Sequence, residues 1–288
     1  MLDKNAISLQ DQVAVITGGG AGFGRAIALA FVNCGARVVI ADNKAENIEK
    51  TLALIAQSPV AGKGECRGVL ADVRVQADVD RLAQETKSAY GHVDILVNNV
   101  GDFLGFVKPF MESSEEEWDA AYDTNLKQIF RVTRAIGPLL EITGNGGSII
   151  NISTIEAFRA MPKISLYSAF KGAITSFTKT LAIELGPKGI RVNTVAPETS
   201  DTDQVPLDYM LKKEHVPYLP YLTPLGRFGT PDDMAGCVLF LASKLSAWVT
   251  GTVVHMDGGA LAAGGFYRIV GTEQWTNMPI VKEGAMAL

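Results

Sequence analysis

The residues whose types and spacing best suit chemistry are a tyrosine, a lysine and a pair of hydroxyl side chains. Tyr167 and Lys171 are four positions apart, so on a helix they share one face about one turn apart. A positive charge beside a phenol favours the phenolate and makes the phenol easier to ionise. Ser153 and Thr154 follow an apolar run at 148–152, and a hydroxyl there could reach the same point in space. This combination predicts a site that handles protons.

Strands and helices that alternate along the chain must position these side chains. Short apolar, β-branched runs predict strands at 13–16, 37–41, 66–71, 93–97, 148–152, 190–195 and 252–256. Helical patterns fit between them at 25–34, 45–57, 75–90, 114–140, 166–185 and 231–242. This alternation predicts an α/β fold with one parallel sheet of about seven strands and helices on both faces.

A glycine-rich turn joins the first strand to the first helix and suits a cofactor diphosphate. Gly18, Gly22 and Gly24 let the backbone turn sharply around Phe23, and the amides of a helix N-terminus attract phosphate. Asp42 ends the second strand, where a carboxylate accepts hydrogen bonds from an adenosine ribose and repels a 2′-phosphate. We therefore expect NAD rather than NADP. The alternatives are a tight turn without a ligand and a helix cap at Asp42.

Further candidate cofactor contacts stand where later strands end. The carboxyl edge of an open α/β sheet is where such folds bind ligands. As single motifs, these residues could equally be turn or cap signals. They are Asp72, Val73, Asn99, Val100 and Gly101.

Composition excludes several other classes of function. The chain has 288 residues, a net charge of −5 and no block of Lys or Arg, so we expect neither nucleic acid nor membrane as a partner. The three cysteines are far apart, His92, His215 and His255 are scattered, and no spacing predicts a metal site. The polar N-terminus has no apolar core of a signal peptide, and a cytoplasmic location fits.

We expect one domain over 1–288, because no repeat, linker or composition shift marks a second one. The irregular segment at about 198–230 is too long for an ordinary loop and predicts a substrate lid. A tail at about 260–288 could cover this pocket, reach a neighbouring subunit or be loose. The candidate pocket walls are mostly apolar: Phe103, Leu104, Phe106, Tyr209, Met210, Leu211, Tyr218, Leu219, Tyr221, Leu222, Phe266, Tyr267 and Trp275.

Taken together, these motifs resemble the compact, single-domain branch of the short-chain dehydrogenase/reductase family. The resemblance rests on Thr17-Gly18-x-x-x-Gly22-x-Gly24, Asn98-Asn99-Val100-Gly101, Asn125, a strand-end hydroxyl and Tyr167-x-x-x-Lys171, and covers about residues 8–260. It implies a Rossmann-type doubly wound sheet of seven parallel strands, a nicotinamide cofactor, and interconversion of an alcohol and a ketone. It also implies a homotetramer, or a homodimer, built on the helices at 114–140 and 166–185.

The resemblance assigns a role to each residue of the proton-handling site. Tyr167 would be the general acid/base, and Lys171 would lower its pKa and bind the nicotinamide ribose. Asn125 would hold a water that links Lys171 to solvent. The family serine stands about thirteen residues before the tyrosine, which selects Thr154; Ser153 is then structural, unless the loop shifts by one residue.

The stretch after the sixth strand departs from the family pattern. Where relatives have Pro-Gly, this chain has Pro197-Glu198, and a glutamate would be strained there if the position needs φ > 0. Thr202 matches the threonine that contacts the nicotinamide amide in relatives, with Thr199 as its rival.

The expected function is that of an NAD-dependent oxidoreductase acting on a bulky, mainly hydrophobic cyclic alcohol or ketone, such as a steroid, terpenoid or aryl carbinol. If Glu156 and Glu198 both face the cavity, a polyol or sugar substrate becomes credible. The competing hypotheses are a nucleotide-sugar epimerase or dehydratase and a non-catalytic NAD-binding protein.

Overall fold

The computed structural model confirms the expected doubly wound sheet. It describes residues 5–60, 64–207, 213–265, 267–269, 271–272 and 275–276. All seven strands of the main sheet are parallel, in the order β3-β2-β1-β4-β5-β6-β7. Their bounds are β1 Val13–Thr17, β2 Arg37–Asp42, β3 Glu65–Leu70, β4 Ile95–Asn98, β5 Gly147–Ile152, β6 Ile190–Pro197 and β7 Val253–Met256.

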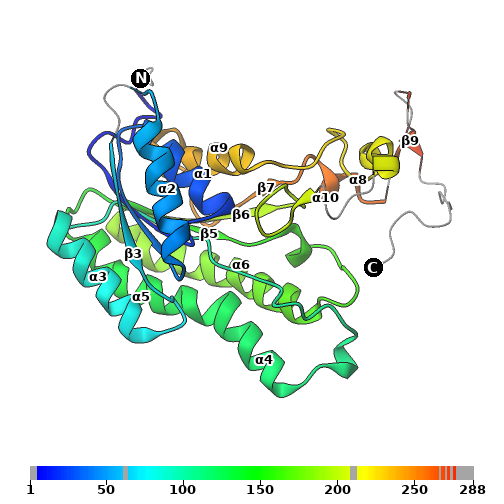
Figure 1. Cartoon of the computed structure of the whole chain (residues 1–288), viewed down its shortest axis with the longest axis horizontal. Helices are drawn as coiled ribbons and strands as arrows, with labels where there is room; N and C mark the ends of the chain where they lie inside the picture. The colour runs from blue at the N-terminus through cyan, green and yellow to red at the C-terminus, as the bar shows by residue number, and fades with distance from the viewer. Residues whose placement is uncertain are drawn as a thin grey trace.

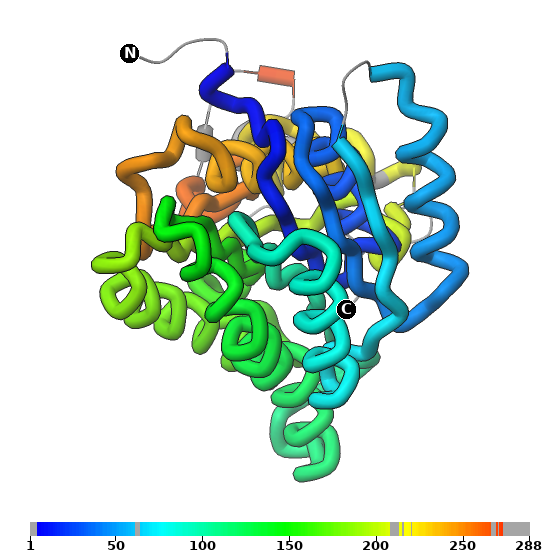
Figure 2. Tube along the Cα trace, turned by 90° about the vertical axis from the view of Figure 1, so that its left-hand side faces the viewer, coloured from blue at the N-terminus to red at the C-terminus, as the bar shows by residue number. Residues whose placement is uncertain are grey.

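Helices cover both faces of this sheet (Figure 1). On one face lie α1 (Gly22–Asn33), α2 (Ala45–Gln57) and α9 (Pro231–Ala242), and α1 packs along α9. The other face carries α3 (Gln76–Tyr90), α5 (Gln128–Glu141) and α6 (Ser165–Leu185). In Figure 2, α3 in cyan and α5 in green run side by side.

The central strands β1, β2, β4, β5 and β6 are buried from both sides because their sequences are apolar at most positions. All five residues of β1 and all four of β4 are buried, and the two sets of side chains join separate core clusters above and below the sheet. Such continuous runs are typical of central parallel strands. The sheet therefore forms a rigid base, and its carboxyl ends meet along one edge.

The single long helix expected over 114–140 is divided in the structure. α4 (Glu115–Tyr122) and α5 are separated by one π-helical turn, Asp123–Lys127. The wider turn contains Asn125, and π turns of this kind are frequent at functional sites. The helical region expected over 114–140 is therefore present from Glu115 to Glu141, and the π turn within it is a detail that helical periodicity alone does not reveal.

The segment at 198–230 lies beside the carboxyl ends of β6 and β7. It is tied back at both ends by the bridge between Ser200 and Gly229 and contains the short helix α8 (Leu219–Leu222). In the tail, β8 (Tyr267–Arg268) pairs with β9 (Trp275–Thr276), and β8 packs against α8. Tyr209, Met210, Leu211 and Phe266 lie outside the described residues, as do the side chains of Tyr267 and Trp275.

None of the helices in the described residues has the length and apolar character needed to cross a membrane. Within the same residues, no group of three or more His, Cys, Asp or Glu side chains could hold a metal ion.

Candidate active site

The glycine turn is built for close contact between backbones. Gly18 and Gly22 have φ of +64° and +49°, a region that favours glycine. A Cβ at Gly24 would collide with the carbonyl oxygen of Gly18. Phe23 lies half-buried between these glycines and packs against the core cluster around α1 and α9. The turn therefore brings the chain closely past the N-terminus of α1, the kind of position at which a diphosphate binds.

The N-terminus of α1 already attracts an anionic group of the chain itself. The Gly22 amide donates to Asp203 Oδ2 at 3.4 Å, and Arg25 Nη1 donates to the same oxygen at 2.9 Å. A carboxylate held by a helix N-terminus and an arginine shows that this position suits negative charge. The residues present therefore fit a phosphate-bearing cofactor.

Asp42 faces the glycine turn from the end of β2. Its Oδ2 accepts a hydrogen bond from the Gly20 amide at 3.1 Å, and its Oδ1 accepts one from the Lys44 amide at 3.0 Å. The Asp42 side chain is buried. It is not the N-cap of α2, because that position is taken by Lys44. The carboxylate is thus held beside the cofactor turn.

The other strand-end residues divide into two groups. Asn99 fastens the turn, because its Nδ2 donates to the carbonyls of Thr17 at 3.0 Å and Gly18 at 3.3 Å. Val100 is half-buried, and its carbonyl accepts from Gln128 Nε2 at 3.1 Å. These contacts bridge β1 and β4, where the strand order reverses and such sheets bind their ligands.

The residues after β3 are less open than expected for cofactor contacts. The Asp72 carboxylate forms an ion pair with Arg74 at 2.7 Å, which holds the pKa of this carboxyl below its usual value. Val73 is buried in the core. Their contact with a cofactor stays a prediction.

Tyr167 and Lys171 lie in the first turns of α6, as the spacing predicts. Lys171 is 2% exposed, and its Nζ donates to the carbonyl of Ile152 at 3.0 Å. The same Nζ lies 5.5 Å from the centre of the Tyr167 ring. A Cβ on Gly101 would come within 2.5 Å of that ammonium, so only glycine leaves room for the lysine. The loop after β4, the end of β5 and the start of α6 therefore meet at one buried cation.

Burial dominates the ionisation of both groups. It raises the pKa of the Tyr167 phenol well above its usual value, and the negative charges of Asp102 and Glu156 raise it further. Burial lowers the pKa of Lys171 to about 8, against the opposing effect of Asp102. The lowered Tyr167 pKa expected from the neighbouring ammonium is therefore not found in the chain alone, because desolvation outweighs it.

The two adjacent hydroxyls have different partners, because successive side chains of an extended segment point opposite ways. Ser153 Oγ donates to the carbonyl of Lys171 at 2.9 Å and so fastens β5 to α6. Thr154 Oγ1 donates to the carbonyl of Pro197 at 3.3 Å, at the ligand-binding edge. Ser153 thus has a structural contact, and Thr154 remains the candidate for orienting a substrate.

Asn125 holds the loop that follows β4. Its Nδ2 donates to the carbonyls of Asp102 at 2.9 Å and Ala121 at 3.1 Å, and its Oδ1 accepts from the Asp102 amide at 3.0 Å. It lies next to the space above Gly101 that Lys171 occupies. Its predicted role in holding a water is not tested by these contacts.

The residues after Pro197, which is buried at the end of β6, come from two sides of the site. Glu198 is not among the described residues with positive φ, so the expected backbone strain does not arise. Thr199 Oγ1 donates to Glu198 Oε1 at 2.8 Å. Thr202 lies over the glycine turn, where a Cβ on Gly22 would be 3.6 Å from Thr202 Cβ. Both threonines stay candidates for the nicotinamide contact.

Sequence reasoning missed three charged residues of the site. Asp102 acts on both Tyr167 and Lys171, Asp203 occupies the N-terminus of α1, and Arg159 pairs with Glu156 and Glu198. Asp203 had a signal, since it follows Thr202 in the chain. Arg159 had the i,i+3 spacing to Glu156 as a local signal, whereas its contact with Glu198 comes from another loop.

The fold and the site define a dinucleotide-binding α/β protein with a tyrosine and lysine at its reacting centre. A model of the family described as enoyl-(acyl carrier protein) reductase matches residues 18–260. The 3-oxoacyl-[acyl-carrier-protein] reductase FabG of Thermotoga maritima is 35% identical over 87% of this chain and 98% of its own length. The (2S)-[(R)-hydroxy(phenyl)methyl]succinyl-CoA dehydrogenase subunit BbsD of Thauera aromatica is 37% identical over 88% and 98%.

Among solved structures, a 7α-hydroxysteroid dehydrogenase complexed with NADH and 7-oxo glycochenodeoxycholic acid matches with a TM-score of 0.82. It is 32% identical, over 90% of this chain and 98% of that one. The chain belongs to the short-chain dehydrogenase/reductase family and is an oxidoreductase of that family. Family membership and this NADH-bound neighbour support a nicotinamide cofactor.

Proposed function

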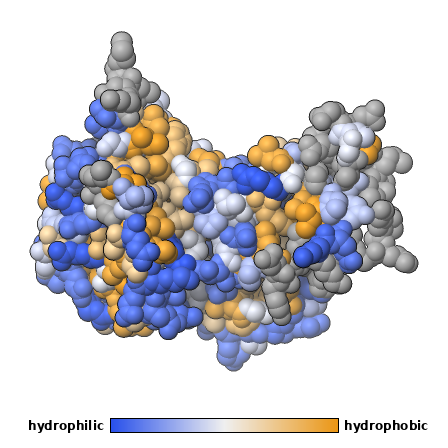
Figure 3. Space-filling view, turned by 45° about the horizontal axis from the view of Figure 1, so that its top comes forward, coloured by the Kyte–Doolittle hydropathy of each residue, from blue (hydrophilic) through white to orange (hydrophobic). Residues whose placement is uncertain are grey.

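We propose that this protein is an NAD-dependent oxidoreductase that interconverts a secondary alcohol and a ketone on a bulky, mainly hydrophobic cyclic substrate. The observation that carries the proposal is the ring of Phe103, which lies 4.2 Å from the Tyr167 ring at 32° and presents an apolar surface beside the acid/base. Figure 3 shows further apolar residues beside a hollow in this face of the molecule. The names of BbsD and of the hydroxysteroid dehydrogenase support a cyclic or aryl substrate.

In this mechanism the chain's residues hold the substrate and move one proton. Thr154 orients the substrate oxygen, and Tyr167 takes the hydroxyl proton during oxidation or returns it during reduction. Lys171, with the positive charge of an oxidised nicotinamide ring, favours the phenolate against the effect of burial. A bound nicotinamide would supply the hydride chemistry, while the residues of the pocket would hold the reacting carbon in place.

Replacing Tyr167 by phenylalanine tests this mechanism. The variant loses the proton carrier but keeps the ring that packs on Phe103, so turnover falls by about 10²–10⁴-fold while the Kd for NADH changes little. Tyr122→Phe, on another helix, is the matched control. Turnover is followed by NADH absorbance with hydrophobic cyclic alcohols, polyols and 3-oxoacyl thioesters. Near-normal turnover of Tyr167→Phe would exclude the assigned role.

The preference for NAD rests on Asp42. Its buried carboxylate beside the glycine turn would repel a 2′-phosphate, and like charges in contact cost several kcal/mol. We expect kcat/KM with NAD to exceed that with NADP by about a hundredfold or more. In Asp42→Ser this ratio falls, whereas in Glu46→Gln, an exposed change in the next helix, it stays. A wild-type preference for NADP would overturn the proposal.

A second candidate is reduction of a 3-oxoacyl group, supported by the name of the Thermotoga maritima relative. Tyr167 and Lys171 would have the same roles in this reaction. The substrate panel above distinguishes 3-oxoacyl reduction from oxidation of a cyclic alcohol. A polyol or sugar substrate is less supported, because Glu156 and Glu198 are both paired with Arg159 and offer no free pair of carboxylates.

We further infer a homotetramer or homodimer built on α4, α5 and α6, as in the family. Segment 198–230 serves as the lid of the site. The first part of the tail extends this lid, since β8 packs against α8. The cytoplasmic location stays a prediction.

A further inference from the structure

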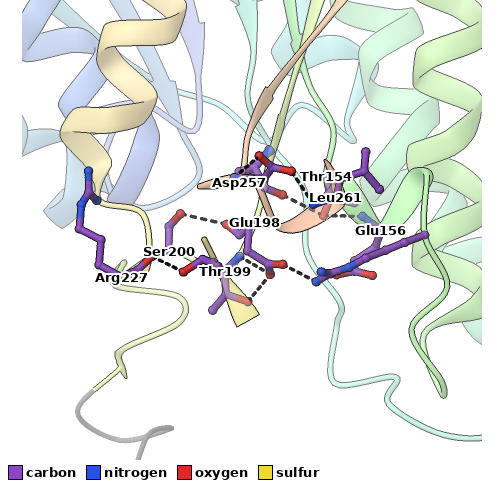
Figure 4. A network of polar contacts seen from close by, with 12 residues as sticks. Thr154, Glu156, Glu198, Thr199, Ser200, Arg227, Asp257 and Leu261 are labelled. Atoms are coloured by element: carbon purple, nitrogen blue, oxygen red, sulfur yellow. Dashed lines mark hydrogen bonds and ion pairs between the residues drawn. The ribbon is translucent and has the colours of Figure 1, made fainter. Parts of the chain in front are cut away.

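A buried cluster of charges joins the loop after β5 to the loop after β6. Arg159 donates to Glu156 Oε1 through Nε at 3.1 Å and Nη2 at 2.7 Å, and Nη2 also donates to Glu198 Oε2. The two glutamate side chains are 8% and 5% exposed, against 30% for the arginine. Figure 4 shows this network at close range. Charges removed from water to this degree depend on their partners.

Each glutamate is also tied to a residue of the candidate reacting centre, Glu156 through its backbone amide and Glu198 through its carboxylate. The Glu156 amide donates to Thr154 Oγ1 at 3.3 Å, and that hydroxyl donates to the carbonyl of Pro197. Glu198 Oε1 accepts from the Thr199 amide at 2.7 Å and from its hydroxyl at 2.8 Å. The position of Arg159 therefore affects both the substrate-orienting hydroxyl and a candidate nicotinamide contact.

The cluster carries one positive and two negative charges and lies near Tyr167. The charged groups that act on this phenol are Lys171 on its own helix, Asp102 after β4 and Glu156 after β5. Glu156 connects the cluster to Tyr167, while Arg159 and Glu198 belong to the cluster through their contacts with each other and with Glu156. Asp102 and Glu156 raise the Tyr167 pKa. In addition, Glu156 Oε2 is buried without a hydrogen-bond partner in the described residues, so Arg159 provides most of its compensation.

We propose that Arg159 is a positioning residue of the active site, which links the loops after β5 and β6 as a clasp and compensates the carboxylates of Glu156 and Glu198. The inference rests on the proposed function for its link to catalysis. The clasp itself rests only on the contacts among Arg159, Glu156 and Glu198.

The signs of the expected effects follow from the charges. Arg159→Met leaves two buried carboxylates uncompensated, and negative charge disfavours the phenolate that alcohol oxidation requires. The rising limb of the pH profile of kcat/KM then moves to higher pH. Glu156→Gln removes one negative charge and moves this limb to lower pH. In the double variant Glu156→Gln/Arg159→Met, the rising limb moves part of the way back from its position in Arg159→Met.

The test compares pH profiles of kcat/KM for alcohol oxidation in the wild type, these three variants and Glu141→Gln. Glu141 is a matched control because it pairs with Lys188 at the surface, at 2.6 Å. We expect shifts of about one pH unit, upward for Arg159→Met and downward for Glu156→Gln, and none for the control. Lower rates with an unmoved limb would mean a merely structural role and overturn the effect on Tyr167. If Arg159→Met does not fold, the shift in Glu156→Gln decides alone.

A second measurement tests the clasp without relying on catalysis. It applies if the wild type turns over no substrate of the panel, a result that would contradict the proposed function and not the clasp. Thermal unfolding midpoints of the wild type, the two single variants and the double variant form a double-mutant cycle. The clasp predicts that Arg159→Met lowers the midpoint and that adding Glu156→Gln brings it partly back. Strictly additive midpoints would show that the two residues do not act together.

Discussion

Lys171 is a buried charge that the proposed chemistry needs and that burial makes costly for the folded state. Its ammonium is almost fully buried beside Gly101 and Asn125, with the carbonyl of Ile152 as hydrogen-bond acceptor. Burial lowers its pKa to about 8, so the charged form is held at a cost to the folded state. A loss of folding stability of this kind is common where function needs a buried charge.

The cost predicts that Lys171→Met unfolds at higher temperature than the wild type while losing most of its turnover. A lysine whose pKa falls from about 10.4 in the unfolded chain to about 8 destabilises the folded chain at pH 7 by roughly 3 kcal/mol. Since the folded pKa is the lower one, this cost is complete below pH 8 and fades as pH rises towards the unfolded value. The difference in melting temperature should therefore narrow between pH 8 and 10. A variant less stable than the wild type at pH 7 would contradict this interpretation.

Single residues of the site were predictable where a local spacing encodes them. The i, i+4 relation placed Tyr167 and Lys171 on one face, and strand alternation separated Ser153 from Thr154. The link from Arg159 to Glu198 was not predictable, because it depends on how two loops approach each other in space. The raised Tyr167 pKa also escaped prediction, because spacing reveals a neighbouring charge but not the loss of water.

At the scale of elements, the segment after β6 and the first helix contact each other across the cofactor turn. Asp203 reaches Gly22 and Arg25 from this segment, and Gln204 Nε2 donates to the Gly101 carbonyl at 3.5 Å. This segment therefore touches both the turn after β1 and the loop after β4. The Asp203 carboxylate lies at the N-terminus of α1, where the proposed cofactor would place its diphosphate.

Asp203→Asn should bind NADH more tightly than the wild type. The change removes a negative charge that competes for the Gly22 amide and for Arg25, and the carboxylate is 55% exposed, so solvent weakens the competition. Exposed pairs are worth about 0.2–1 kcal/mol, which corresponds to a Kd lower by up to about fivefold. Fluorescence titration with NADH measures it, and Asp201→Asn in the same exposed stretch is the control. Weaker binding would mean that Asp203 assists the cofactor.

Element bounds followed closely from sequence patterns, because capping and apolar periodicity are local. α9 begins at Pro231 after Thr230, whose side chain and that of Asp233 form a reciprocal capping box. The π turn at Asp123–Lys127 was the exception. It depends on Asn125 bonding to the loop after β4, a tertiary contact that no helical pattern contains.

At the scale of the whole molecule, the order of the strands determines where the site lies. The chain builds β1, β2 and β3 outward, returns to β4 beside β1, and continues to β7 at the other end of the sheet. Alternation along the sequence predicted the parallel sheet and its two helical layers. The contents of the pocket were not predictable, because its walls combine loops from four strands with a lid whose path depends on tertiary contacts.

The packing of α1 along α9 has a consequence for how the protein is made. The two helices share one core cluster, yet about 200 residues lie between the end of the first and the start of the second. At ~5–20 residues per second, the ribosome reaches α9 roughly 10–40 s after it has completed α1. Until then part of the apolar face of α1 has no neighbour. The nascent N-terminal half must therefore wait, exposed to chaperones and to aggregation, for a partner from the last fifth of the chain.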